Sequence, residues 1–250
     1  MNRKIKDSII GVLVILVIAA LIIFVYNNVK ISEQRALERR IHALSPRGGI
    51  PQSIENLREA IAIYESQIEF NVRTGAQTGV YWKILAIRLA DRNMHRDALE
   101  ALDRAIYYNT GDPTLFYLTG DYASVVAAAV MGFSGDAAAE KEHLINLAEN
   151  GYLRAIQLDE TYMNPRLGLG VLYTFDLNRP ADAIPHLELV IRSSPSNVQA
   201  MFVLARAYYM TENFFPAIEL YDRIIAVSRD QNVQAEAQNN KEIIMGLQGF

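Results

Sequence analysis

A helical hairpin recurs along this chain at a nearly fixed period. Two segments near the C-terminal end superpose with Ala183 on Ala217 and Leu187 on Tyr221, an offset of 34 residues, and the same small residue recurs upstream at Ala98. Repeats of this length are typical of stacked supersecondary units, in which each unit buries its apolar face against its neighbour. The repeat therefore predicts an all-α solenoid of antiparallel helix hairpins, which provides surfaces and not a catalytic centre.

Breakers and apolar runs divide the chain into six segments. The sequence predicts a loop at residues 73–79, between a divergent pair and the first clear repeat. The segments are a short basic tail (1–8), a transmembrane signal-anchor helix (9–26), a juxtamembrane helix and linker (27–50), a divergent first repeat (51–78), repeats with a lengthened hairpin at about 113–160 (79–229), and a C-terminal capping helix (230–250).

The segment from Ile9 to Tyr26 has eighteen residues without a charge. Such a helix is about 27 Å long, close to the thickness of a bilayer core. It predicts an uncleaved anchor in the lipid bilayer. The rival interpretation is a cleaved signal peptide with Val17 and Ala19 at the cleavage positions, but cleavage there would leave an apolar stretch at the new N-terminus.

Orientation follows from the basic residues on either side of that run. Arg3, Lys4 and Lys6 lie before it, and four basic residues follow it between Lys30 and Arg40. The count is close to a tie, so the undiluted N-terminal charges favour a cytoplasmic N-terminus. The expected location is a single-pass bacterial inner (cytoplasmic) membrane protein with a periplasmic, or otherwise extracytoplasmic, repeat domain.

Helix starts are marked by capping residues. Asp112-Pro113 combines an N-cap residue with proline at the first helical position, and Asn164-Pro165 repeats the device. Ser196 and Gln199 have the spacing of a capping box. These signals place the boundaries of three hairpins.

The repeats resemble those of the tetratricopeptide repeat (TPR) family. The marks of that family are an aromatic residue, a Leu-Gly or Leu-Ala pair and a second aromatic in the first helix, then Ala, an aromatic and Ala in the second. The matching residues are Trp82, Leu85, Ala86, Leu89, Ala98, Leu102 and Ala105; Leu169, Gly170, Tyr173, Ala183, Leu187 and Val190; and Met201, Leu204, Ala205, Tyr208, Ala217, Tyr221 and Ile224. The similarity covers about residues 79–229.

One unit departs from the period, because Ala98 and its counterpart Ala148 are 50 residues apart. The sixteen extra residues predict a hairpin whose two helices both run about two turns longer than their neighbours. Met131 and Phe133 would then lie at an apolar tip that contacts a partner or a membrane surface. The alternative is a tip that folds back over the groove.

Composition and motifs give no sign of catalysis, a metal or a cofactor. There is no cysteine, and the four histidines (His42, His95, His143 and His186) show no metal-binding spacing, which favours surface or capping roles. Gly168 and Gly170 lie inside a helix, where they are packing residues and not a phosphate loop. The chain carries a net charge of −4, and its basic residues are concentrated before residue 50, so an acidic main body argues against nucleic acid.

The resemblance implies that the first helix of each repeat lines a concave groove for a partner protein. Its inward positions are Lys83, Ile87, Tyr117, Asp121, Leu167, Val171, Phe175, Phe202, Arg206 and Tyr209. Some family members hold a chaperone tail there with a clamp of Lys, Asn and Arg residues. Here Ile87 and Leu118 occupy places where that clamp needs Asn, so an apolar helix or an extended peptide is the better fit. The alternative is that these residues pack against neighbouring helices or the chain's own terminal helix.

The function expected from these features is that of a membrane-anchored protein-binding scaffold or assembly factor. The anchor suggests a bacterial envelope machine, in secretion, envelope biogenesis or a flagellar-motor accessory structure. The alternative is a helper subunit of a solute transporter that binds an apolar small ligand, and an enclosed interior cavity would favour it. The sequence predicts no oligomeric state.

Overall fold

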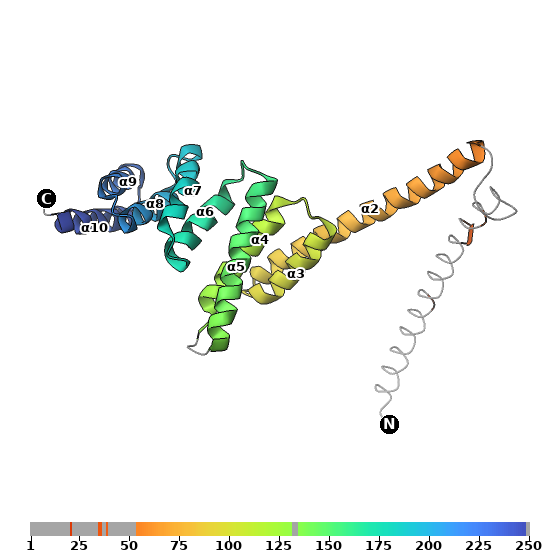
Figure 1. Ribbon diagram of the computed structural model, residues 1–250, viewed down its shortest axis with the longest axis horizontal. Coiled ribbons are helices and arrows are strands. Elements are labelled where there is room, and N and C mark those ends of the chain that lie inside the picture. The colour runs from red at the N-terminus through yellow and green to blue at the C-terminus, as the bar shows by residue number, and fades with distance from the viewer. Residues whose placement is uncertain (1–20, 22–34, 37–38, 40–53, 132–134, 249–250) are drawn as a thin grey trace, which may run out of the picture. The chain divides into compact units, whose positions relative to one another are not determined.

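The described part of the chain is helical throughout its regular structure. The computed structural model describes residues 54–131 and 135–248, together with residues 21, 35, 36 and 39 (Figure 1). Within these residues the regular elements are α-helices and one π-helical turn, which confirms the all-α class. The chain forms two compact units, Met1–Arg73 and Thr74–Phe250.

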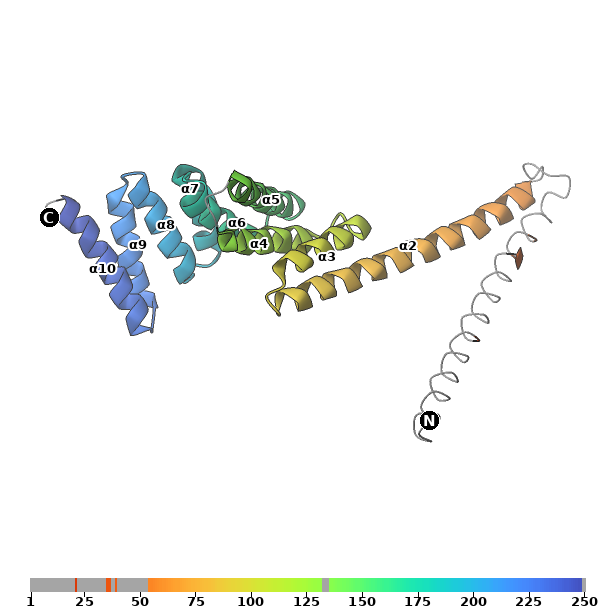
Figure 2. The same ribbon diagram turned by 90° about the horizontal axis from the view of Figure 1, so that it is seen from below.

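The second unit is a row of helical hairpins (Figures 1 and 2). From α3 onward each pair of consecutive helices packs together, and α4, α6 and α8 also contact one another in that order. First helices therefore form one continuous layer, as in a TPR-like solenoid. The elements are α2 (Ile54–Ala90), α3 (His95–Tyr108), α4 (Pro113–Ala129), α5 (Gly135–Leu158), α6 (Met163–Val171), η1 (Leu172–Asp176), α7 (Pro180–Ser193), α8 (Val198–Met210), α9 (Phe214–Val227) and α10 (Gln231–Gln248).

Small residues at the repeat marks let the two helices of each hairpin approach closely. Ala98, Ala148, Ala183 and Ala217 stand at the same place in four second helices, and each is 0% exposed. A larger side chain there would push the helices apart, because packed interiors leave little free space. The periodic alanines predicted from the sequence are thus the contact points of the solenoid.

The loop predicted at residues 73–79 is wrong, because α2 runs through it without a break. Gly79, within this segment, allows close contact between α2 and α3. A Cβ on Gly79 would lie 2.9 Å from the Cβ of Tyr108 and 3.5 Å from the backbone oxygen of Ala105 in α3. The bare backbone of Gly79 therefore lets α3 end against α2. The segment 51–78 consequently does not end in a turn of its own.

The hairpin of α4 and α5 is long, as predicted, but its two helices are unequal. Helix α4 has 17 residues and α5 has 24, whereas α3, α7 and α9 have 14 each. The prediction that both helices would lengthen equally is wrong, because most of the extra length lies in α5. Met131 is 90% exposed at the tip, and Phe133 lies outside the described residues.

A single π-helical turn, η1, accommodates one extra residue of the third hairpin. Ala148 and Ala183 are 35 residues apart, one more than the repeat. The Leu177 N–H donates to the Leu172 oxygen at 3.0 Å, the five-residue spacing of a π-turn. The buried Thr174 hydroxyl donates to the Gly170 oxygen at 2.7 Å.

One of the three predicted helix caps lies at the predicted residue, and the other two are displaced along the chain. The Asp112 side chain caps α4 by accepting from the Thr114 N–H, as expected. At α8 the cap is Asn197, which accepts from the Ala200 N–H, one residue after the predicted Ser196. The cap predicted at Asn164 is wrong, because the N-cap of α6 is Tyr162 and Asn164 lies within the first turn of the helix.

The predicted localisation is corrected. Within the residues that the structure describes, no helix combines the length and the apolar character needed to cross a bilayer. The expected single-pass inner-membrane protein with a periplasmic repeat domain has no support there. The predicted anchor itself, residues 9–26, lies outside the described residues except for Leu21.

Candidate functional site

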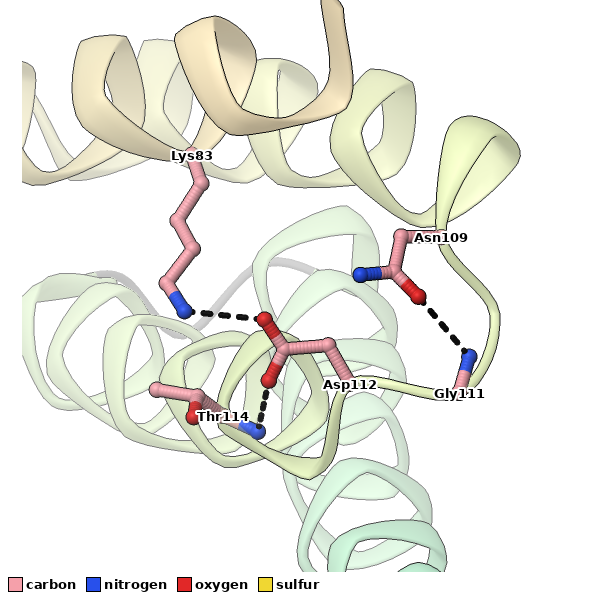
Figure 3. A network of polar contacts seen from close by, with 5 residues as sticks. All are labelled: Lys83, Asn109, Gly111, Asp112 and Thr114. Carbon is pink, nitrogen blue, oxygen red and sulfur yellow. Dashed lines mark hydrogen bonds and ion pairs between the residues drawn. The ribbon is translucent and has the colours of Figure 1, made fainter. Parts of the chain in front are cut away.

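The first predicted groove residue, Lys83, forms an ion pair with another residue of the same chain (Figure 3). Its Nζ lies 2.8 Å from Oδ2 of Asp112, whose Oδ1 accepts from the Thr114 N–H at 2.9 Å. Beside them Asn109 Oδ1 accepts from the Gly111 N–H at 3.3 Å. This network ties α2 to the start of α4. Lys83 thus serves as a structural cation.

The carboxylate of Asp112, which accepts hydrogen bonds from both Lys83 and Thr114, has a shifted pKa. Burial raises the pKa of Asp112, but the hydrogen bonds from Lys83 and Thr114 outweigh burial and leave the pKa below its ordinary value. The carboxylate is therefore the stable form. The neighbouring groove position, Ile87, is 36% exposed.

The middle of the predicted groove is filled by tyrosine rings. Tyr117 packs edge to face on Tyr162, with ring centroids 5.3 Å apart, and lies 6.3 Å from Tyr152. Burial, with a smaller contribution from Asp121, raises the pKa of Tyr117 to about 12. Burial also raises the pKa of Asp121, and the charge of His95 opposes that shift. In this part of the inner layer, the predicted groove residue Tyr117 therefore packs against other residues of the same chain.

The ring of Tyr152 lies between two helices at glycines. A Cβ on Gly120 in α4 would stand 2.6 Å from the ring, and a Cβ on Gly168 in α6 would stand 2.5 Å from it. Gly170 approaches Leu187 as closely. These contacts confirm that the Gly168 and Gly170 pair is a packing feature. Leu167 and Val171, on the same helix, are half-buried against the core.

The C-terminal third of the predicted groove is hollow. A pocket of about 280 Å³ is lined by four of the predicted residues, one from η1 and three from α8. Those four are Phe175, Phe202, Arg206 and Tyr209. Phe175 is 57% exposed, although it is a large apolar side chain. The structure thus brings together the last four predicted positions and leaves the six earlier ones in other surroundings.

Helix α10 forms the far wall of this pocket. Its contributors are Glu236, Asn240, Ile243 and Ile244, of which Ile244 is 2% exposed and Ile243 is 52% exposed. Helix α10 packs on α9 (Figure 2). The chain's own terminal helix therefore borders the groove without filling it.

The pocket carries one cation and one carboxylate on an aromatic floor. The Arg206 guanidinium lies 5.2 Å from the centroid of the Tyr209 ring, a cation–π distance, and Phe202 packs edge to face on Tyr221. Glu236 stands on the opposite wall. Such a site can bury an apolar side chain and hydrogen-bond the polar backbone beside it.

The pocket residues on α10 were missed by the sequence prediction, which assigned residues 230–250 to a capping helix and to no site. Adjacent residues of a helix point about 100° apart, so only one of them can face the core fully. This helical geometry could have indicated from the sequence that one of the two isoleucines, here Ile243, faces away from the core.

Two of the histidines, which the sequence assigned to surface or capping roles, are half-buried against aromatic rings. The ring of His95 is 5.6 Å from Tyr122, and that of His186 is 6.0 Å from Tyr173. Burial, followed by the nearby Arg166, lowers the pKa of His186. Among the described residues, no group of three or more His, Cys, Asp or Glu residues is placed to hold a metal ion. His42 lies outside the described residues.

A second pocket, of about 380 Å³, opens between α3, α4 and α5. Its apolar lining is Leu99, Ile106, Phe116 and Leu147. The pocket is also lined by three polar residues, Asp103, Asn150 and Arg154. The Arg154 guanidinium lies 5.8 Å from the centroid of the Phe116 ring. None of these residues was predicted as part of a site.

Comparison with known proteins agrees with this architecture. A family model described as tetratricopeptide repeat matches residues 175–239. No curated protein matches the sequence. Because the family match covers a minor part of the chain, it supports the repeat over that range.

Solved structures share the fold at low sequence identity. MamA 41-end from Desulfovibrio magneticus RS-1 is 14% identical, with a TM-score of 0.52 over 68% of this chain and 95% of that one. The MamA RS-1 ArsTM double mutant is 16% identical, with a TM-score of 0.52 over 68% of this chain and 96% of the other. A further MamA crystal structure is 16% identical, with a TM-score of 0.51 over 77% and 99%. At such identities the likeness concerns the fold alone.

Proposed function

We propose that this TPR-like solenoid is a protein-binding scaffold that takes an apolar partner segment, a helix or an extended peptide, in the pocket between η1, α8 and α10. The observation that carries the proposal is the exposure of Phe175 in a pocket that already contains Phe202 and Tyr209. Aromatic side chains in concave, partly desolvated sites supply most of the affinity in protein interfaces. Solenoids of this kind use extended concave surfaces for binding.

The volume of the pocket limits how much of a partner it can enclose. A volume of about 280 Å³ accommodates one or two side chains and not a whole folded surface. Arg206 and Asn240 at its edge can bind the backbone carbonyls of a peptide. Glu236 can accept from a backbone N–H or pair with a basic side chain. A peptide with one bulky apolar anchor meets all of these groups.

The earlier part of the inner layer has a structural role in this proposal. Lys83 is paired with Asp112, and Tyr117 packs on Tyr162. A partner bound at the C-terminal pocket could extend along Leu167 and Val171, which are only partly buried. Met131, whose side chain is 90% exposed, is a separate contact point for the same partner.

The expected place in a bacterial envelope machine rested on the predicted anchor. With the membrane localisation corrected, the proposal stands on the pocket alone.

The test is selection of peptides from a random displayed library on the purified full-length chain, followed by affinity measurements. Phe175→Ala and Arg206→Ala should each weaken the selected peptides at least tenfold. Phe215→Ala is the matched control, because Phe215 is 72% exposed and does not line the pocket. Equal affinity for all variants would show that the peptides bind elsewhere and would refute the proposed site.

A second candidate is binding of a small apolar ligand in the pocket between α3, α4 and α5. Its four apolar side chains and about 380 Å³ suit a compact hydrophobic molecule. Leu99→Trp would occupy that space and abolish uptake of a fluorescent apolar probe there. Unchanged probe binding by this variant would exclude the pocket.

A further inference from the structure

Each first helix of the solenoid buries the same face against the hairpin before it, except the earliest. Leu85 of α2 corresponds to Thr119, Leu169 and Leu204 in the three later hairpins. Those three are 9%, 0% and 3% exposed, whereas Leu85 is 43% exposed. One repeat position therefore has two environments within a single chain.

The neighbouring positions on that face are also more exposed in α2 than in the later hairpins, although Leu118 and Gly168, two counterparts of Ile84, are half-buried and not fully buried. Tyr81 is 64% exposed, whereas its counterparts Leu115 and Ala200 are 1% and 0% exposed. Ile84 is 48% exposed, and its counterpart Val203 is 6% exposed. The fourth position of the face is Arg88, where later hairpins have apolar residues.

The cause of the contrast lies in the order of packing. Helix α3 covers α4, α5 covers α6 and α7 covers α8, because each second helix packs on the first helix that follows it. At the other end of the solenoid α10 covers α9. The face of α2 formed by Tyr81, Ile84, Leu85 and Arg88, called here the open stacking face, has no such cover among the described residues. Solenoids require their terminal apolar faces to be covered.

We propose that the open stacking face is a self-association surface, on which the same face of a second copy of this chain packs antiparallel about a two-fold axis. The face is complementary to itself in that arrangement. With the axis midway between residues 84 and 85, Ile84 lies opposite Leu85 of the second copy. Tyr81 then lies opposite Arg88 of the second copy, and the same two contacts recur by symmetry.

The chemistry of both contacts is favourable. Ile84 and Leu85 bury aliphatic surface at the centre. Arg88 has its side chain 74% exposed and only a 3.5 Å contact to Asp91, so its guanidinium is available to stack on a ring. Tyr81 offers that ring. The presence of Arg in place of an apolar residue at this one repeat position is thereby explained.

Disulfide formation tests the arrangement directly, because the chain has no cysteine of its own. In the purified full-length protein, Leu85→Cys lies beside the two-fold axis and should oxidise to a disulfide-linked dimer. Tyr107→Cys, at a site 78% exposed on α3, is the matched control and should remain monomeric. Failure of the Leu85→Cys protein to form the dimer overturns the proposal. So does protection of that thiol from a maleimide in a monomer, which would mean that the chain covers the face itself.

Charge exchange tests the antiparallel register. By sedimentation, the wild-type chain should show twice the monomer mass as concentration rises, and Arg88→Glu should lose this species. The double variant Tyr81→Arg with Arg88→Glu should regain it, since each introduced arginine would meet the introduced glutamate of the second copy. A double variant that stays as monomeric as the single one rules out this pairing. All of these side chains are exposed, so the helical circular dichroism should be unchanged and serves as the folding control.

Discussion

The ring of Tyr152 in α5 packs against the backbone of Gly168 in α6, so closely that a Cβ at that glycine would stand 2.5 Å from the ring's Cζ. Gly168→Ala should therefore lower the free energy of unfolding by about 1–3 kcal/mol, because the added methyl group would overlap a ring that is also packed closely against Gly120. Chemical denaturation followed by circular dichroism measures the change.

The matched control is Gly246→Ala in α10, where an added Cβ would meet nothing within 4 Å. This change should raise stability by up to about 1 kcal/mol, since alanine favours the helix over glycine. If both substitutions shifted stability in the same direction, close packing of the tyrosine would not be the reason for glycine at 168.

The pair of Asp112 and Lys83 predicts a contribution to stability that depends on pH. The pKa of Asp112 is lower in the folded chain than its ordinary value, so its stabilising effect is full above that ordinary value and is lost as pH falls through the folded pKa. Asp112→Asn keeps an N-cap but loses the ion pair. It should cost about 1 kcal/mol at pH 7 and less at pH 2, since the ion pair weakens as the pH falls toward the folded pKa.

Urea unfolding at the two pH values measures that difference, with the emission of Trp82 as the signal. Trp82 is the one tryptophan of the chain and packs against the core of the first hairpin, beside the pair. A cost that stays constant with pH would mean that the carboxylate charge contributes nothing.

Glu212 sits in the turn between α8 and α9 with a φ of 60°, a conformation that disfavours most side chains. The corresponding turns have Asn93 and Asn178 there, at 60° and 51°. Glu212→Gly should raise the free energy of unfolding by about 0.5–1 kcal/mol. Glu219→Gly, in the middle of α9, should lower it by about 1 kcal/mol. Thermal melts of the two variants should move in opposite directions.

Adjacent isoleucines in α10 separate stability from binding. Ile244 is 2% exposed, so Ile244→Ala should cost about 2–4 kcal/mol. Ile243 is 52% exposed in the pocket, so Ile243→Ala should cost less than about 1 kcal/mol and weaken a selected peptide several-fold. Calorimetric binding and denaturation together make the comparison. Full peptide affinity in the Ile243 variant would remove α10 from the site.

Much of the fold was predictable because the repeat encodes it. Alanines such as Ala98 and Ala217 have one function, close helix contact, and their period survives in the sequence. Gly79 shows the limit. A glycine in a Thr-rich stretch has the composition of a loop, and only the position of Tyr108 reveals that it lies inside a helix. Local propensity cannot report a contact made 29 residues away.

The site was only partly predictable for a similar reason. The first-helix positions follow from the repeat, so Phe175 and Phe202 were identified in advance. Whether a position is open depends on its neighbours, as Lys83 shows by pairing with Asp112. Ile243 lines the pocket from α10, a helix without the repeat marks, so the resemblance to the TPR family could not identify it as a site residue.

The π-helical turn from Leu172 to Asp176 has a consequence for how such a chain can vary in length. One residue inserted into an uninterrupted α-helix would swing every later side chain by about 100° around the axis, and the next hairpin would present its polar side to the core. Winding the extra residue into a wider turn confines the error to five residues. Ala183 then enters its contact in phase with Ala217 one period later, so an insertion in one hairpin leaves the helical phase of the next unchanged.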